Sequence, residues 1–153
     1  MRIRPTLLAA PLIPYLLAGH TASRPVTSRK TSDLTLTVVV VGATADGGAI
    51  AAALYASPDG FPGKVAKAAK VSQHPRTAAV DSFVFRGLAP GQYAVSVYHD
   101  LNSNGKLDAH LFGVPKEPWG TSASVRPSLR APRFEEGRID LTTSTRIEIR
   151  VER

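Results

Sequence analysis

Oxygen-bearing side chains recur at alternate positions in one short segment of this chain. From Asp100 to Asp108 the sequence reads D-L-N-S-N-G-K-L-D, with glycine at the sixth position. Proteins bind calcium with carboxylate, amide and carbonyl oxygens, and a glycine at this position permits the sharp backbone turn of a calcium loop. The spacing therefore predicts a calcium site with five ligands: Asp100, Asn102, Asn104 and Asp108 through their side chains and Lys106 through its carbonyl.

The predicted loop differs from a helical EF-hand at its twelfth position. Leu111 stands there, where a bidentate glutamate is expected. A loop between two β-strands, with Asp108 carrying more of the coordination, fits better. Calcium takes about six to eight oxygens, so water or another carboxylate must complete the shell. The candidates are Glu117, Glu135 and Glu136. The alternative is a metal-free hairpin in which the Asn, Asp and Gly residues form Asx-turns.

The elements that must position this loop are β-strands. Alternating or β-branched apolar residues predict strands over 34–41, 49–56, 78–86, 93–99, 138–142 and 145–152. Residues 64–71 predict a short helical turn, and the Pro- and Gly-rich segment 112–120 predicts irregular structure. About seven antiparallel strands with short turns indicate an all-β, immunoglobulin-like or prealbumin-like sandwich. The strand over 93–99 runs directly into Asp100, so a sheet would hold the base of the loop.

The N-terminus has the layout of a secretory signal peptide. Arg2 and Arg4 precede an apolar stretch from about residue 7 to 18, and small or polar residues follow. A membrane span needs roughly 20 apolar residues, so this stretch is short for one. We expect a signal peptide over 1–23, a flexible lead-in over 24–32 and a single β-sandwich domain over 33–153. Export to the periplasm or the medium follows, with no stable membrane span after cleavage; an uncleaved N-terminal anchor is the alternative.

Composition excludes several classes of chemistry. The chain has no cysteine, which removes a cysteine-linked lipid anchor, disulfides and thiolate sites. Its formal net charge is +7, but the basic residues are scattered. A groove that binds single-stranded nucleic acid places aromatic residues among its basic residues, and the basic residues of this chain lack such neighbours. We therefore expect no nucleic-acid partner. Attraction to anionic envelope polymers or lipid headgroups is the alternative reading of the positive charge.

The histidines and the single tryptophan define the alternatives to a calcium module. His99 and Asp100 are neighbours on a predicted strand and so point to opposite faces, while His74 and His110 are predicted in loops. We therefore predict no catalytic residue and a non-enzymatic protein; a small hydrolase using His99 or His110 is one alternative. Trp119 would ordinarily cap the core. If it were exposed, it could stack on a sugar, which gives the other alternative, a module that binds an envelope glycan or protein.

Four motifs occur in order along the chain. They are L-A-P-G-Q-Y-A-V-S-V-Y-H-D at 88–100, N-G-K-L-D at 104–108, F-G-V-P-K-E at 112–117 and A-P-R-F-E at 131–135. Together they resemble the exported bacterial family called domain of unknown function 2141, over roughly 34–151. The hairpin over 85–95 also resembles that of prealbumin-like sandwich modules, in which Leu88 and Tyr93 would pack into the core. The resemblance implies a secreted β-sandwich and leaves the activity uncharacterised.

Overall fold

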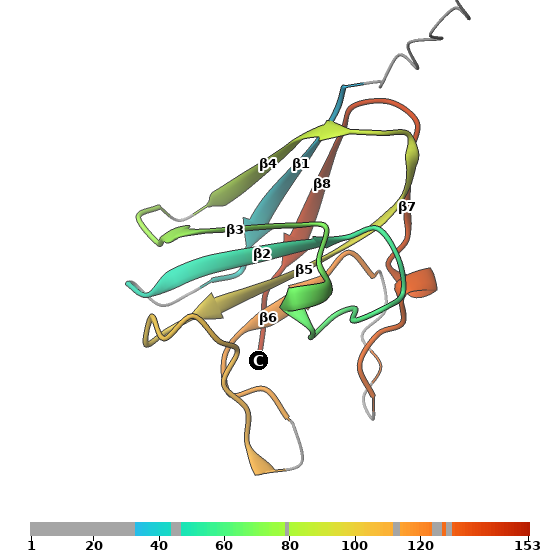
Figure 1. Ribbon diagram of the computed structural model, residues 1–153. Helices are drawn as coiled ribbons and strands as arrows, with labels where there is room; N and C mark the ends of the chain where they lie inside the picture. Colours follow the sequence, from blue (N-terminus) through green and yellow to red (C-terminus); the bar gives the residue numbers. More distant parts are fainter. Residues whose placement is uncertain (1–32, 44–46, 79, 112–113, 124–126, 128–129) are drawn as a thin grey trace, which may run out of the picture.

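The computed structural model describes residues 33–43, 47–78, 80–111, 114–123, 127 and 130–153. The predicted signal peptide over 1–23 and lead-in over 24–32 lie outside these residues. Two β-sheets pack face to face and enclose a hydrophobic core between them (Figure 1). The predicted all-β sandwich is therefore confirmed. No helix in the described part of the chain is long and apolar enough to cross a membrane.

In the part of the chain that the structure describes, eight strands form the two sheets. The three-stranded sheet has the order β4-β1-β8, made of β4 (Asp81–Leu88), β1 (Leu34–Val41) and β8 (Thr145–Arg150). The five-stranded sheet has the order β3-β2-β5-β6, made of β3 (Lys70–Pro75), β2 (Ala49–Tyr55), β5 (Gly91–Asp100) and β6 (Trp119–Thr121), with β7 (Ile139–Leu141) paired to the start of β5. Strands β1 and β8 run parallel, whereas all other named pairs are antiparallel.

The apolar period of the strands accounts for the core. In β1 the inward-facing side chains of Leu36, Val38 and Val40 are buried in the same cluster as residues from the opposite sheet. Alternate residues of a strand share a face, so this pattern places every second side chain between the sheets. Leu88 and Tyr93 are both buried in the core, as the hairpin resemblance implies. The Tyr93 hydroxyl also donates to the carbonyl of Ala89 at 2.9 Å and so closes the turn between β4 and β5.

Strand β3 corrects the sequence prediction for residues 64–71. Only Val65–Lys67 forms a helical turn, the 3-10 helix η1, and the chain then pairs with β2 as an edge strand. Every residue of β3 except His74 is exposed, so no apolar pattern marks the strand. Pairing with β2 satisfies its backbone groups instead, because an edge strand needs only one hydrogen-bonded neighbour. The prediction of His74 in a loop was therefore wrong.

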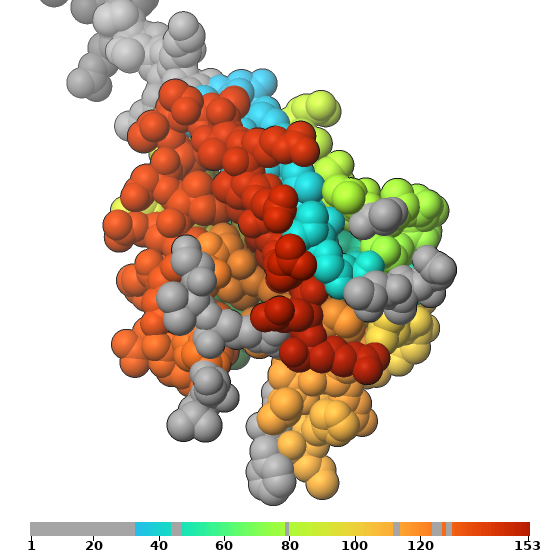
Figure 2. All heavy atoms as spheres, turned by 180° about the vertical axis from the view of Figure 1, so that it is seen from behind, coloured from blue at the N-terminus to red at the C-terminus, as the bar shows by residue number. Residues whose placement is uncertain are grey.

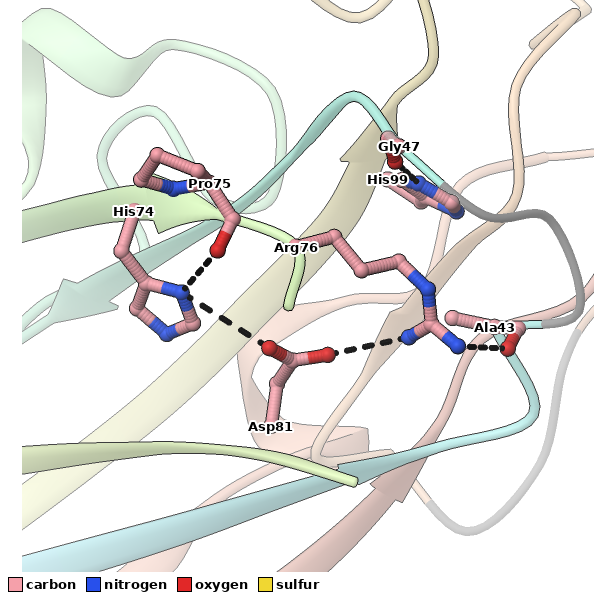
Figure 3. Close-up of polar contacts among 7 residues, drawn as sticks. All are labelled: Ala43, Gly47, His74, Pro75, Arg76, Asp81 and His99. Atoms are coloured by element: carbon pink, nitrogen blue, oxygen red, sulfur yellow. Dashed lines mark hydrogen bonds and ion pairs between the residues drawn. The ribbon is translucent and has the colours of Figure 1, made fainter. Parts of the chain in front are cut away.

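One end of the sandwich holds both the candidate loop and a polar network. The register pairs Ala49 with Asp100 on one side of β2 and with Pro75 on the other, so the end of β5 and the end of β3 lie close together. Just beyond β3, Arg76 forms an ion pair with Asp81 at 3.0 Å and donates to the carbonyl of Ala43 at 2.6 Å (Figure 3). Both charged side chains are buried. This network links the connection between β3 and β4 to the segment that follows β1.

Candidate functional site

Asp100 anchors the candidate loop. It is the last residue of β5 and is fully buried. One carboxylate oxygen accepts a hydrogen bond from the amide of Asn104 at 3.1 Å, and the other accepts one from the amide of Gly105 at 2.7 Å. A buried carboxylate must be paired or hydrogen-bonded, and two backbone donors meet that need here. The side chain of Asp100 therefore stabilises the first turn of the loop through two hydrogen bonds from the backbone.

The backbone of the loop has the conformation that the motif predicts. Gly105, at the sixth position, has a φ of 79°. Asn102 accepts a hydrogen bond from the amide of Asn104 and Asn104 accepts one from the amide of Lys106, which are Asx-turn contacts. The Tyr98 hydroxyl donates to the carbonyl of Gly105 at 3.2 Å. Local hydrogen bonds thus hold the loop in this conformation without the help of an ion.

The environment of Tyr98 reflects the carboxylates at the base of the loop. Burial raises the pKa of Tyr98, and the negative charges of Asp100 and Glu117 raise it further. Its hydroxyl therefore keeps its proton and stays a hydrogen-bond donor to the loop. The same field of negative charge would favour a cation at this end of β5.

The predicted side-chain ligands gather in one network. Asn102 donates to one oxygen of Asp108 at 2.8 Å, and Asn104 donates to the other at 3.1 Å. The amide oxygens of Asn102 and Asn104 each accept one backbone amide and keep a second lone pair. The donor set therefore fits a hard cation that prefers oxygen.

Glu117 joins the two ends of the loop. One carboxylate oxygen accepts the amide of Leu101 at 2.8 Å, and the other accepts the amide of Asp108 at 3.0 Å. The side chain is buried. Sequence reasoning named Glu117 only as a candidate to complete a metal shell, whereas the structure gives it a second role that the motif does not reveal. It closes the base of the loop. In the sequence, only its position in a Pro-flanked segment indicated that this side chain would be held in a fixed place.

The other two candidate glutamates lie in the 3-10 helix η3 (Phe134–Glu136). Glu136 forms a two-pronged ion pair with Arg130, at 2.8 and 2.5 Å, and accepts the amide of Arg133. Glu135 is exposed. Within the described residues, no group of three or more histidine and acidic side chains comes close enough to hold a metal ion. A calcium site in the loop would thus depend on amide and carbonyl oxygens as well as on carboxylates.

The histidines have distinct environments. His99 is fully buried on the core side of β5, and its Nε2 lies 2.9 Å from the carbonyl of Gly47 (Figure 3). The ring therefore lies on the opposite face of β5 from the side chain of Asp100. His74 stacks on Phe83 with ring centres 4.7 Å apart, and its Nδ1 lies 3.7 Å from Asp81. Sequence reasoning missed this contact, because it predicted His74 in a loop and not on β3.

A cavity of about 270 Å³ lies where β6 of one sheet passes β8 of the other. Trp119 lines it, together with polar residues that include Thr121, Glu148 and Arg150. The backbone of Trp119 forms a β-bridge with Glu152, which joins the two sheets at this edge. The prediction of irregular structure over 112–120 therefore missed a short strand. Trp119 is partly buried beside the cavity.

Fold and site together define a β-sandwich domain with an Asp- and Asn-rich loop at one end. The chain belongs to the family described as an uncharacterized protein conserved in bacteria (DUF2141), whose model matches residues 38–148. The resemblance of the four ordered motifs is thereby confirmed. Neither a curated protein nor a solved structure matches the chain.

Proposed function

We propose that this bacterial protein is an exported, non-enzymatic β-sandwich module whose loop from Asp100 to Asp108 binds calcium. The ion would be structural: it would hold the loop and the connection that follows it in one conformation. The N-terminal layout over residues 1–23 supports export to the periplasm or the medium, where calcium is more abundant than inside a cell. Calcium bound to the folded form alone would raise the free energy of unfolding.

The observation that carries the proposal is the position of Asp100. Its carboxylate is fully buried at the start of a loop in which Asn102, Asn104 and Asp108 form one hydrogen-bonded network. Each carboxylate oxygen of Asp100 accepts one amide and has a further lone pair. The environment of His99 supports the non-enzymatic part, because a fully buried imidazole has no access to a substrate.

Calorimetric titration of calcium into the chelator-stripped chain tests the proposal, together with melting curves in calcium and in chelator. We expect saturable binding and a higher melting temperature in calcium. At a calcium concentration 100 times the Kd, the added stability would be about 2.7 kcal/mol. Asp108→Asn should weaken binding, whereas Asp59→Asn, at an exposed aspartate paired with Lys67, should not. Equal melting temperatures in calcium and chelator, with no heat of binding, would refute the proposal.

The cavity beside Trp119 favours a second candidate function. Its lining combines an aromatic side chain with carboxylate, guanidinium and hydroxyl groups, as polar ligands such as sugars require. The module would then present this surface to an envelope glycan or a protein partner. A glycan array and a pull-down, each with Trp119→Ala as the control, test it. The substitution keeps the backbone bridge to Glu152, so a loss of binding would report on the ring.

A further inference from the structure

Asn104 and Gly105 form an Asn-Gly pair within the candidate loop. Asparagine is a chemically labile residue, and a glycine after it leaves the next backbone nitrogen without a Cβ to shield it. That nitrogen can attack the side-chain amide of the asparagine, because the two groups are neighbours in one chain. Both residues are exposed, so water reaches them. The gold-coloured atoms of the loop lie at the surface in the lower half of Figure 2.

The reaction at this pair is deamidation, and water is its only co-reactant. The nitrogen of Gly105 forms a bond to Cγ of Asn104 and gives up its proton. The bond from Cγ to Nδ2 breaks, and Nδ2 takes up the proton and leaves as ammonia. Water then opens the cyclic succinimide at either of its carbonyls. Opening at one carbonyl gives an aspartate at position 104, and opening at the other gives isoaspartate, which adds a methylene carbon to the main chain.

The folded loop engages both reacting groups in hydrogen bonds. The amide of Gly105 donates to Asp100 at 2.7 Å. The side-chain oxygen of Asn104 accepts the amide of Lys106 at 2.9 Å, and its side-chain nitrogen donates to Asp108 at 3.1 Å. Ring closure draws the nitrogen of Gly105 away from Asp100 and turns the side chain of Asn104. These hydrogen bonds must therefore break before the bond to Cγ can form.

Asp100 makes this restraint firm. Its side chain is fully buried at the end of β5, so the exposed Gly105 is bonded to a group that the sheet holds in place. Hydrogen bonds to a carboxylate are also stronger than those between neutral groups. A group that must leave such contacts reacts mainly during local opening of the structure. The rate at Asn104 should therefore follow the fraction of molecules in which the loop is open.

We propose that Asn104 is the deamidation site of this chain and that the closed loop protects it, so that opening of the loop starts the reaction. The change is irreversible, and isoaspartate at position 104 alters the spacing of the oxygen-bearing side chains, which keeps the loop from closing again. Calcium would slow the reaction, because it would hold the loop closed. This last part rests on the proposed calcium function, whereas the protection itself rests on the hydrogen bonds within the loop.

The two asparagines of the chain, Asn102 and Asn104, supply the site and an internal control. The protein is incubated at mildly alkaline pH in chelator, either folded or in urea, and tandem mass spectrometry measures deamidation at each position. We expect Asn104 to react at least about tenfold more slowly in the folded protein than in urea, because opening breaks hydrogen bonds to carboxylates. In urea, Asn102 should react more slowly than Asn104, because Ser103 has a Cβ.

A variant of the loop tests the protection directly. Asp108→Ser removes the carboxylate that accepts the side-chain nitrogen of Asn104. In chelator it should speed deamidation at position 104 of the folded protein about fivefold and leave the rate in urea unchanged. Asp59→Ser, at an exposed aspartate outside the loop, is the matched control and should change neither rate. Circular dichroism checks that both variants fold, and the comparison of folded and unfolded wild type needs no variant.

A rate at Asn104 that is equal in the folded protein and in urea, or faster in the folded protein, would overturn the protection. Faster deamidation of Asn102 than of Asn104 in urea would overturn the assignment of the site.

The calcium link is judged separately, by repeating the folded incubation in calcium. At about 100 times the Kd, an ion that binds only the closed loop should slow the reaction about a hundredfold. Equal rates in calcium and chelator would overturn that link. Calorimetry on fresh protein decides whether the loop binds calcium at all, so failure of the protection and failure of the proposed calcium function are distinguishable.

Discussion

Gly48 lies directly against the main chain of Asp100. A Cβ atom at position 48 would come within 2.4 Å of the Asp100 carbonyl oxygen, and the φ of Gly48 is +70°. The next residue, Ala49, pairs with Asp100 in the sheet. The start of the candidate calcium loop is therefore braced by the turn that leads into β2, which is distant in sequence.

Replacing Gly48 by alanine should destabilise the fold more than replacing Gly47. Both glycines have positive φ, which costs an L-residue about 1 to 2 kcal/mol, but a Cβ at Gly47 meets nothing within 4 Å. Gly48→Ala adds a clash with backbone, which should cost about 1 kcal/mol or more beyond Gly47→Ala. Chemical denaturation of the two variants measures the difference. Equal stability of the two would contradict the close packing of Gly48 on Asp100.

Glu117→Gln should destabilise the protein in chelator as well as in calcium. An amide can accept one of the two backbone hydrogen bonds that Glu117 accepts, and its NH₂ group would face the other donor. Leaving one buried amide unsatisfied costs about 1 to 3 kcal/mol. The exposed Glu135→Gln is the matched control. If the loss were seen only in calcium, Glu117 would act as a metal ligand and not as a clamp on the empty loop.

The buried ion pair of Arg76 and Asp81 should matter far more than the exposed pair of Lys67 and Asp59. The side chains of the first pair are 7 % and 3 % exposed, those of the second 56 % and 64 %. Asp81→Asn removes the negative charge from a buried ion pair, and breaking such a pair costs about 3 to 5 kcal/mol. Asp59→Asn should cost about 0 to 1 kcal/mol. Urea unfolding of both variants tests the ranking, and a similar midpoint for both would refute it.

The ion pair of Glu136 predicts a pH dependence. Hydrogen bonds from Arg130 and from the backbone of Arg133 lower the pKa of Glu136 to about 2, from an ordinary value of 4.5. A lowered pKa means that the contribution to stability is fully present above pH 4.5 and is lost as the pH falls through 2. The melting temperatures of wild type and Glu136→Gln should therefore converge in that range.

Nuclear magnetic resonance titration of the Glu136 carboxyl carbon measures the same shift directly. Arg130→Gln should return the midpoint toward the ordinary value, because the guanidinium is the largest cause of the shift. A midpoint near 4.5 in the wild type would show that the pair does not persist in solution.

Much of the fold can be predicted from the sequence where the apolar pattern is strong. Residues 34–41 form β1 with the predicted bounds, and β4 and β5 are joined at the predicted Pro-Gly turn. The prediction that these two strands form a hairpin was wrong, because β4 pairs with β1 in one sheet and β5 pairs with β2 in the other. The prediction fails for β3 because its residues are exposed and only its partner β2 makes it a strand. The described residues form eight strands where about seven were predicted, and β1 and β8 pair in parallel where all strands were predicted to be antiparallel.

The sequence by itself determined the local conformation of the candidate loop. Asp100, Asn102 and Asn104 bond to amides two to five residues further on, and Gly105 supplies the positive φ, so short-range contacts suffice to shape the turn. Whether that loop binds calcium stays a prediction.

Only the tertiary structure decided what holds the loop in place. The carboxylate of Glu117 reaches both ends of the loop, and Gly48 packs against Asp100. Each contact joins residues that come together only after the strands have paired and the sheets have packed. Local propensity carries no information about such pairings, because their geometry is set by strand register and by the packing of two faces.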